Sequence, residues 1–211
     1  MSVRVLVLCG DQWHPAADVR LGFNALSDAR FDFDYAVDCG QGAVALLREY
    51  SVVIVVKVNH RSASDQSPWL TVTTQSAVRD FVSHGGGLFL IHGGTCYKDL
   101  PEMCGVAGGA FLKHPDECPV TVEPMSGHQM TAGVNRFTER DEQYFVELNA
   151  ADAKVFLFSR SQHGMQPAGW TRTVGNGRVC VLTSGHNRAV WMHPEFEKLL
   201  RNGLIWLSRL A

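Results

Sequence analysis

The chain has 211 residues, and 19 Lys and Arg stand against 21 Asp and Glu, which gives a formal net charge of −2. Apolar residues make up 45% and charged residues 19%, so there is no excess of cations to bind nucleic acid or an anionic membrane surface. No apolar segment reaches 18 residues, and the run Val5–Cys9 is too short for a signal-peptide core. We expect a cytoplasmic protein with reduced cysteines and one domain over residues 1–211, with 20 Gly and 9 His as its unusual features.

The first half of the sequence alternates strands and helices. Compact apolar runs predict four strands, at Val3–Leu8, Phe33–Val37, Ser51–Val58 and Leu88–Ile91. The helices expected between them cover about residues 18–27, 43–48 and 71–83, the last ending at His84-Gly85. This alternation indicates an α/β fold with a parallel sheet, in which ligands bind beyond the carboxyl ends of the strands.

The second half has shorter elements. Strands are expected at about residues 119–123, 144–148 and 155–158, and a hairpin joins 170–174 to 178–183 around Gly175-Asn176-Gly177. The chain closes with a helix from Pro194 to Leu207 whose apolar residues repeat at helical spacing and should face the sheet. Trp206 in this helix fits either the core or the contact of a homodimer.

Two glycine-rich patterns do not indicate a ligand. His84-Gly-Gly-Gly87 resembles a lipase oxyanion hole, but no G-x-S-x-G motif accompanies it, and a helix end with a tight turn explains the glycines. Neither G-x-G-x-x-G nor a P-loop motif is present, so no nucleotide cofactor is expected.

Three histidines follow predicted strands. His14, His92 and His186 come after the strands that end at Leu8, Ile91 and Thr183, so they should meet at one edge of the sheet. Imidazole is both a common acid–base group and the commonest metal ligand, and zinc suits imidazoles combined with a carboxylate. Their spacing is not local, so a shared divalent metal and separate roles both stay open.

Other polar and aromatic residues are candidates for the same site. In Asp141-Glu-Gln-Tyr144, Glu142 is a candidate acid–base group, although a solvated turn explains the two carboxylates equally well. Substrate contacts are expected from five side chains in the loops, namely Asp11, Trp13, His14, His128 and Tyr144. Trp13 and Trp170 offer aromatic faces on which a sugar ring can stack.

Several motifs together resemble a known family across nearly the whole chain. They occur in the order Cys9-Gly-Asp-Gln-Trp-His-Pro15, Gly85–Gly94, His128–Val134, Asp141–Tyr144, Trp170–Val179, Ser184-Gly-His-Asn187 and Pro194–Trp206. In this combination the sequence resembles the ThuA-like, or trehalose-utilisation, family of the class I glutamine-amidotransferase-like superfamily. The departures are at Gln129, where the family commonly has Pro, and at Asn187, where Asp is common.

The resemblance implies a flavodoxin-like three-layer sandwich with a mostly parallel central sheet. It places His92 where the superfamily has its nucleophilic cysteine and His186 near its catalytic histidine. Because an imidazole replaces the thiol that attacks the amide, glutamine hydrolysis is not expected. The family is linked to catabolism of trehalose and related sugars at the level of 3-keto sugars.

The sequence therefore leads to three hypotheses of function. In the first, an enzyme acts on a small carbohydrate with His92, His186 and Glu142 as catalytic residues, and His14, His92 and His186 hold a divalent metal such as zinc. In the second, a thiol-dependent, amidase-like enzyme uses Cys96 or Cys9. In the third, the chain is a sugar-binding or assembly module without catalysis. We favour the first hypothesis.

Overall fold

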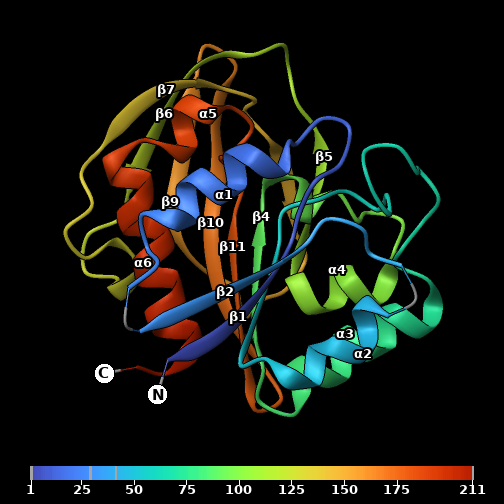
Figure 1. The fold of residues 1–211 in the computed structure, drawn as a ribbon. Coiled ribbons are helices and arrows are strands. Elements are labelled where there is room, and N and C mark those ends of the chain that lie inside the picture. Colours follow the sequence, from blue (N-terminus) through green and yellow to red (C-terminus); the bar gives the residue numbers. More distant parts are fainter. Residues whose placement is uncertain (1, 29, 41, 211) are drawn as a thin grey trace.

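The computed structural model describes residues 2–28, 30–40 and 42–210, in which helices cover both faces of a nine-stranded sheet (Figure 1). In the order in which they lie side by side, the strands are β2 (Phe31–Ala36), β1 (Val3–Leu8), β3 (Val52–Val55), β4 (Gly87–Ile91), β11 (Gly177–Leu182), β10 (Gly164–Val174), β9 (Lys154–Ser161), β6 (Cys118–Pro124) and β7 (Phe137–Asp141). The first five are parallel, and each of the last four is antiparallel to its neighbour. Strands β5 (Gly109–Lys113) and β8 (Phe145–Leu148) pair separately.

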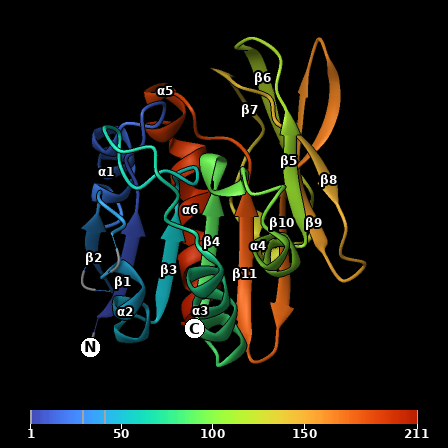
Figure 2. The same ribbon diagram turned by 90° about the vertical axis from the view of Figure 1, so that its right-hand side faces the viewer.

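The sheet separates two hydrophobic cores. Side chains of a strand alternate between its faces, so Val5 and Val7 of β1 join one core while Leu6 and Leu8 join the other. The first core is covered by α1 (Ala16–Asn24), α5 (Arg188–Trp191) and α6 (Pro194–Ser208). On the opposite face lie α2 (Ala43–Leu46), α3 (Val72–Ser83) and α4 (Pro101–Ala107) (Figures 1 and 2). The three-layer α/β sandwich is confirmed.

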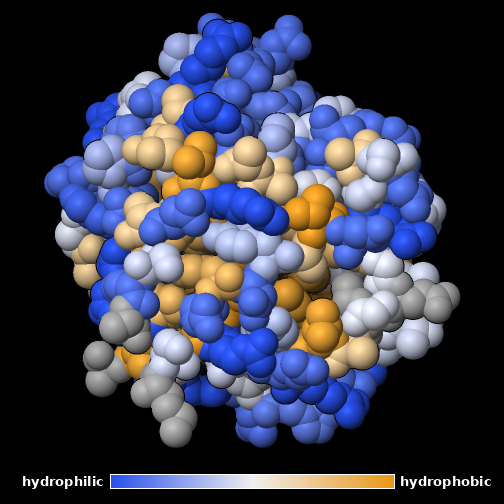
Figure 3. Space-filling model, in the orientation of Figure 1, coloured by the Kyte–Doolittle hydropathy of each residue, from blue (hydrophilic) through white to orange (hydrophobic). Residues whose placement is uncertain are grey.

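Short 3₁₀ turns complete the element list, at η1 (Leu47–Glu49), η2 (His92–Thr95) and η3 (Gln129–Thr131). The outer surface seen in Figure 3 carries hydrophilic residues around its rim and hydrophobic residues towards its middle. No helix in the described ranges is both long enough and apolar enough to cross a membrane.

The main differences from the sequence expectations lie after β3 and in the second half. Strand β3 ends at Val55 rather than Val58, because side chains bind the next backbone groups: Asp11 accepts from the Val58 N–H, and the Tyr97 hydroxyl donates to the Lys57 carbonyl. Helix α4 and strands β5 and β7 were not predicted from the sequence. Their apolar residues are too few and too interrupted to show a period, and their pairing is long-range.

Strand direction decides which loops share an edge of the sheet. The antiparallel order β11-β10-β9-β6-β7 makes β7 run in the same direction as β11 and β4. The residue after β7 therefore emerges at the edge where the residues after β1, β4 and β11 emerge. Strand β6 runs the other way, so the loop that follows it emerges at the opposite edge (Figure 2).

Candidate metal centre

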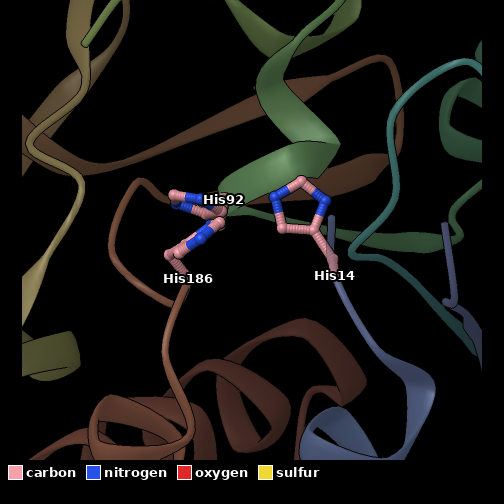
Figure 4. Close-up of side chains that lie close together, drawn as sticks. All are labelled: His14, His92 and His186. Carbon is pink, nitrogen blue, oxygen red and sulfur yellow. The ribbon is translucent and has the colours of Figure 1, made fainter. Parts of the chain in front are cut away.

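Three imidazoles from three distant parts of the chain meet at the carboxyl edge of the parallel strands. His14 follows β1, His92 follows β4 directly and His186 follows β11, and Figure 4 shows their rings turned towards one another. The ring centroids are 5.0 to 5.4 Å apart, and one ring nitrogen of each residue lies within 4.8 Å of one from each of the others. The sequence expectation that these three histidines come together is met.

His92 occupies an unusual backbone position. Its φ of 46° lies in the left-handed region, which side chains other than glycine rarely adopt. The residue begins the turn η2, which the Thr95 hydroxyl closes by donating to the His92 carbonyl at 2.7 Å. The sharp turn directs a fully buried imidazole across the end of the sheet. Such strain is typical of functional sites, and the rest of the fold must hold it in place.

Hydrogen bonds fix the protonation of two of the rings. His14 Nδ1 lies 2.8 Å from the carboxylate of Asp11, and His92 Nδ1 lies 2.8 Å from the carbonyl of Thr183. Because a carboxylate and a carbonyl only accept hydrogen bonds, Nδ1 carries the proton in both rings. In the neutral imidazoles, each Nε2 therefore carries a lone pair. This second contact on the far nitrogen is typical of histidines that bind metals.

Asp11 holds the loop that carries His14. Its carboxylate is buried and accepts from the backbone N–H groups of Trp13, His14 and Val58 as well as from the His14 ring. Burial works to raise the pKa of Asp11, but the hydrogen bonds from His14 and from the backbone outweigh it and lower the pKa to about 2. Asp11 therefore orients His14 from below, and its expected contact with substrate stays a prediction.

We expect Asp11→Asn to lower the free energy of unfolding by about 2 kcal/mol at pH 7. The folded-state pKa of about 2 lies below the ordinary value, so the ionised carboxylate stabilises the fold above about pH 4 and this contribution disappears as the pH falls through 2. Urea unfolding should show the difference from wild type shrinking to about half by pH 3. Asp80→Asn, which removes an exposed pair with Arg79, should change stability by less than about 0.5 kcal/mol. A difference that is constant with pH would contradict the role of the Asp11 charge.

Glu142 brings a carboxylate to the histidines. Its Oε2 lies 3.3 Å from His92 Nε2 and 3.3 Å from His186 Nδ1. Burial works to raise the pKa of Glu142, but the contact with His92 and the charges of His186 and His114 outweigh it and lower the pKa. Burial lowers the pKa of His92 to about 4, against the influence of Glu142. At neutral pH the carboxylate is therefore charged and the His92 ring is neutral.

The chemistry of these groups fits a bound cation. The three ring nitrogens His14 Nε2, His92 Nε2 and His186 Nδ1 are buried and have no hydrogen-bond partner among the described residues. The neutral His92 ring presents a lone pair on Nε2, and the ionised carboxylate of Glu142 faces this nitrogen at 3.3 Å with no proton between them. Lone pairs and a negative charge repel one another unless a positive charge lies among them. Three imidazoles with a nearby carboxylate fit zinc.

The surrounding residues close the site. The Tyr144 ring stacks on His92 with 4.0 Å between centroids, and the Cys96 thiol lies 3.7 Å from the Tyr144 hydroxyl. Tyr144 is buried, so it forms a wall of the site. Burial raises the pKa of Cys96 to about 12 and that of Cys9 to about 11. Both thiols are therefore protonated at neutral pH, which argues against a thiol-dependent mechanism.

Three other candidate residues, His128, Trp170 and Trp13, differ in where they lie relative to the three histidines. His128 lies in the loop after β6, at the opposite edge of the sheet, where it stacks on Phe156 and lines a hollow of about 610 Å³. The structure therefore does not bring His128 to the three histidines, and its expected contact with substrate stays a prediction. Trp170 is fully buried and donates to the Ala107 carbonyl, so it cannot stack on a sugar. Trp13 is 51% exposed beside His60, with 5.4 Å between ring centroids, and it offers an open aromatic face next to His14 in the sequence.

Several neighbours of the site were not identified from the sequence. Glu117 Oε1 lies 3.5 Å from His186 Nε2, and His114 Nδ1 lies 3.7 Å from Glu142 Oε1. Asp141 and Gln143 flank Glu142 in the sequence and are both buried. The four successive polar residues Arg140–Gln143 alternate between more exposed and buried positions. Burial depends on neighbours in space, so the sequence alone carried no signal for these residues.

A comparison with protein families finds a match over nearly the whole chain. The sequence model of ThuA, described as trehalose utilisation, matches residues 4–207. The chain belongs to the ThuA family. None of the curated proteins compared with this ThuA chain matches it.

Solved structures show the same fold. A ThuA-like protein from Bacteroides uniformis is 21% identical with a TM-score of 0.75, covering 97% of this chain and 91% of its own. Another, from Parabacteroides merdae, is 16% identical with a TM-score of 0.77 and covers 99% and 90%. A protein from Salmonella typhimurium described as cytoplasmic is 13% identical, with a TM-score of 0.67 and coverage of 97% and 98%. At these identities the likeness establishes the fold of the ThuA chain.

Proposed function

We propose that this ThuA protein is an enzyme that holds a divalent cation, with zinc as the best fit, on His14, His92 and His186, and that acts on a 3-keto sugar related to trehalose. The observation that carries the proposal is the convergence of three unpartnered, buried imidazole nitrogens next to the carboxylate of Glu142. The family description, trehalose utilisation, supports a carbohydrate substrate. Bound there, the cation supplies a Lewis acid towards a carbonyl or hydroxyl oxygen.

The residues of the chain have separate roles in this proposal. Glu142 is ionised and half-buried, so it can accept a proton from the carbon next to the keto group, where the carbonyl makes the C–H acidic. Tyr144 covers one face of His92 and keeps water from that side of the ring. Trp13 offers its open face to the apolar side of a sugar ring at the rim.

The metal proposal is tested by metal analysis of protein purified without chelators or an affinity tag that binds metal. We expect about one zinc per chain, and we expect added zinc to raise the melting temperature of protein stripped with a chelator. At a free zinc concentration 100 times Kd, the free energy of unfolding should rise by about 2.7 kcal/mol. Absence of both the native metal and the zinc-dependent stabilisation would refute the proposal.

We expect Glu142→Gln to lower turnover of 3-keto-trehalose by about 100-fold or more, because it removes the proton acceptor. It should lower zinc affinity as well, but the three imidazoles should still hold the ion. NMR of the sugar measures turnover and calorimetry measures zinc binding. The matched control is Glu147→Gln, an exposed carboxylate of β8, which should change neither quantity. Undiminished turnover by the Glu142 variant would exclude Glu142 as the base.

We also propose that the protein acts in the cytoplasm, in keeping with the Salmonella relative that is described as cytoplasmic. A homodimer remains part of the proposal. The Trp206 ring is only partly buried: it packs against the core, and the Arg178 guanidinium lies 5.2 Å from its centroid. Sedimentation velocity measures the oligomeric state directly.

A further inference from the structure

Glu142 reaches the histidines from the far edge of the sheet. It follows β7, and three strands (β10, β9 and β6) separate β7 from β11, the strand that precedes His186. No backbone pairing joins β7 to β11 or β4 in the sheet order. The distance of 3.3 Å between Glu142 and His186 must therefore be set by side chains that hold the end of β7 against the loop after β11.

Asp141 makes that connection. Its side chain is 2% exposed, and its two oxygens accept from the backbone N–H of Gly185 at 3.1 Å and of His186 at 3.0 Å. An ionisable group is costly to bury, and Asp141 forms no ion pair with a Lys, Arg or His among the described residues. The proposed chemistry does not use Asp141, so its burial calls for another explanation.

The neighbours of Asp141 follow an alternating pattern. Gln143 is fully buried and donates to the carbonyls of Ser159 and Gly164 at 3.1 and 3.0 Å, which pins the segment to the β9–β10 hairpin. Glu142 and Tyr144 lie between and beyond these anchors and face His92. A second link runs beside Asp141, because the Asn187 side chain donates to the Arg140 carbonyl at 3.1 Å.

We propose that Asp141 is a positioning residue that fastens the end of β7 to the Gly185–His186 backbone, and thereby sets Glu142 against the histidines. The residue itself touches neither the cation nor the substrate. This inference rests on the proposed function for its effect on zinc, but the fastening itself is independent of any metal. The two parts can therefore be tested separately.

The first measurement is amide hydrogen exchange in zinc-free protein. Asp141→Asn should accelerate exchange at Gly185 and His186 by about 10-fold or more, because one of the two accepting oxygens is replaced by an NH2 group, which cannot accept a hydrogen bond. Asn187→Ala loosens the same junction from its exposed side and should give a smaller change in the same direction. Asp152→Asn, which changes an exposed carboxylate paired with Arg172, is the control and should change nothing at these amides. Unchanged protection in the Asp141 and Asn187 variants would overturn the fastening.

The second measurement is a double-mutant cycle on zinc affinity. Asp141→Asn should weaken zinc binding by about 10- to 100-fold in the native background, and by at least about five-fold less when Glu142→Gln is already present. A residue that merely supports the fold would cost the same factor in both backgrounds, and that result would overturn the positioning role. If Asp141→Asn does not fold, Asn187→Ala enters the same cycle. If wild-type protein binds no zinc, the proposed function fails while the exchange experiment still decides on the fastening.

Discussion

His92→Asn should lower zinc affinity by on the order of 1000-fold, beyond the 10- to 100-fold that loss of an outer partner costs. The change removes one of three converging nitrogens and leaves the metal two imidazoles. Asparagine tolerates the left-handed backbone better than most residues, so φ of 46° is kept with less strain. The free energy of unfolding of zinc-free protein should therefore fall by only about 1 kcal/mol, because the packing lost on Tyr144 slightly outweighs the strain that is relieved.

The measurement is the melting temperature with and without zinc, together with calorimetric titration. Wild type should gain stability with zinc, whereas His92→Asn should melt at one temperature in both conditions. His84→Asn is a suitable control, because this exposed histidine caps α3 at the amino edge of the sheet, far from the site. A variant at position 92 that is still stabilised by zinc as strongly as wild type would remove His92 from the metal site.

The sequence predicted correctly that the three histidines meet, because local patterns were enough for this. Strands β1, β4 and β11 are apolar on both faces, their ends are marked by polar and glycine residues, and parallel strands place their carboxyl ends at one edge. We can therefore expect the residues that follow such strands to meet even when the order of the strands is unknown. His14, His92 and His186 needed only this rule.

His128 lies elsewhere, because β6 runs antiparallel to β9 and its carboxyl end is at the other edge of the sheet. Strand direction in the second half depends on hairpins and long-range pairing, which a single sequence does not encode locally. Glu142 was found only as one of two adjacent carboxylates. Its place beside His92 depends on β7, a strand with only two buried residues whose pairing with β6 the pattern could not show.

The turn after β4 leads to the second large effect, which is expected for Gly93→Ala. A methyl group on Gly93 would lie 2.8 Å from the His14 ring and 2.9 Å from the Val56 carbonyl oxygen, both well inside contact distance. The backbone oxygen belongs to the end of the sheet and cannot move easily, so the His14 ring must shift. We expect a loss of about 3 kcal/mol in the free energy of unfolding and a loss of about 100-fold in zinc affinity. Urea unfolding and calorimetry measure the two effects.

Two further variants separate the contact with His14 from a general effect of alanine. Gly105→Ala lies in α4 with nothing within 4 Å of the added carbon, and it should raise stability by up to about 1 kcal/mol because alanine favours a helix. In a His14→Ala background, Gly93→Ala should cost clearly less stability than in the native chain, since only the Val56 carbonyl still opposes the methyl group. An equal cost in both backgrounds would show that the backbone contact alone excludes a side chain at position 93. If the cost of Gly93→Ala depends on His14, this glycine is linked to the proposed metal site, because the His14 imidazole occupies the space that a side chain at position 93 would fill.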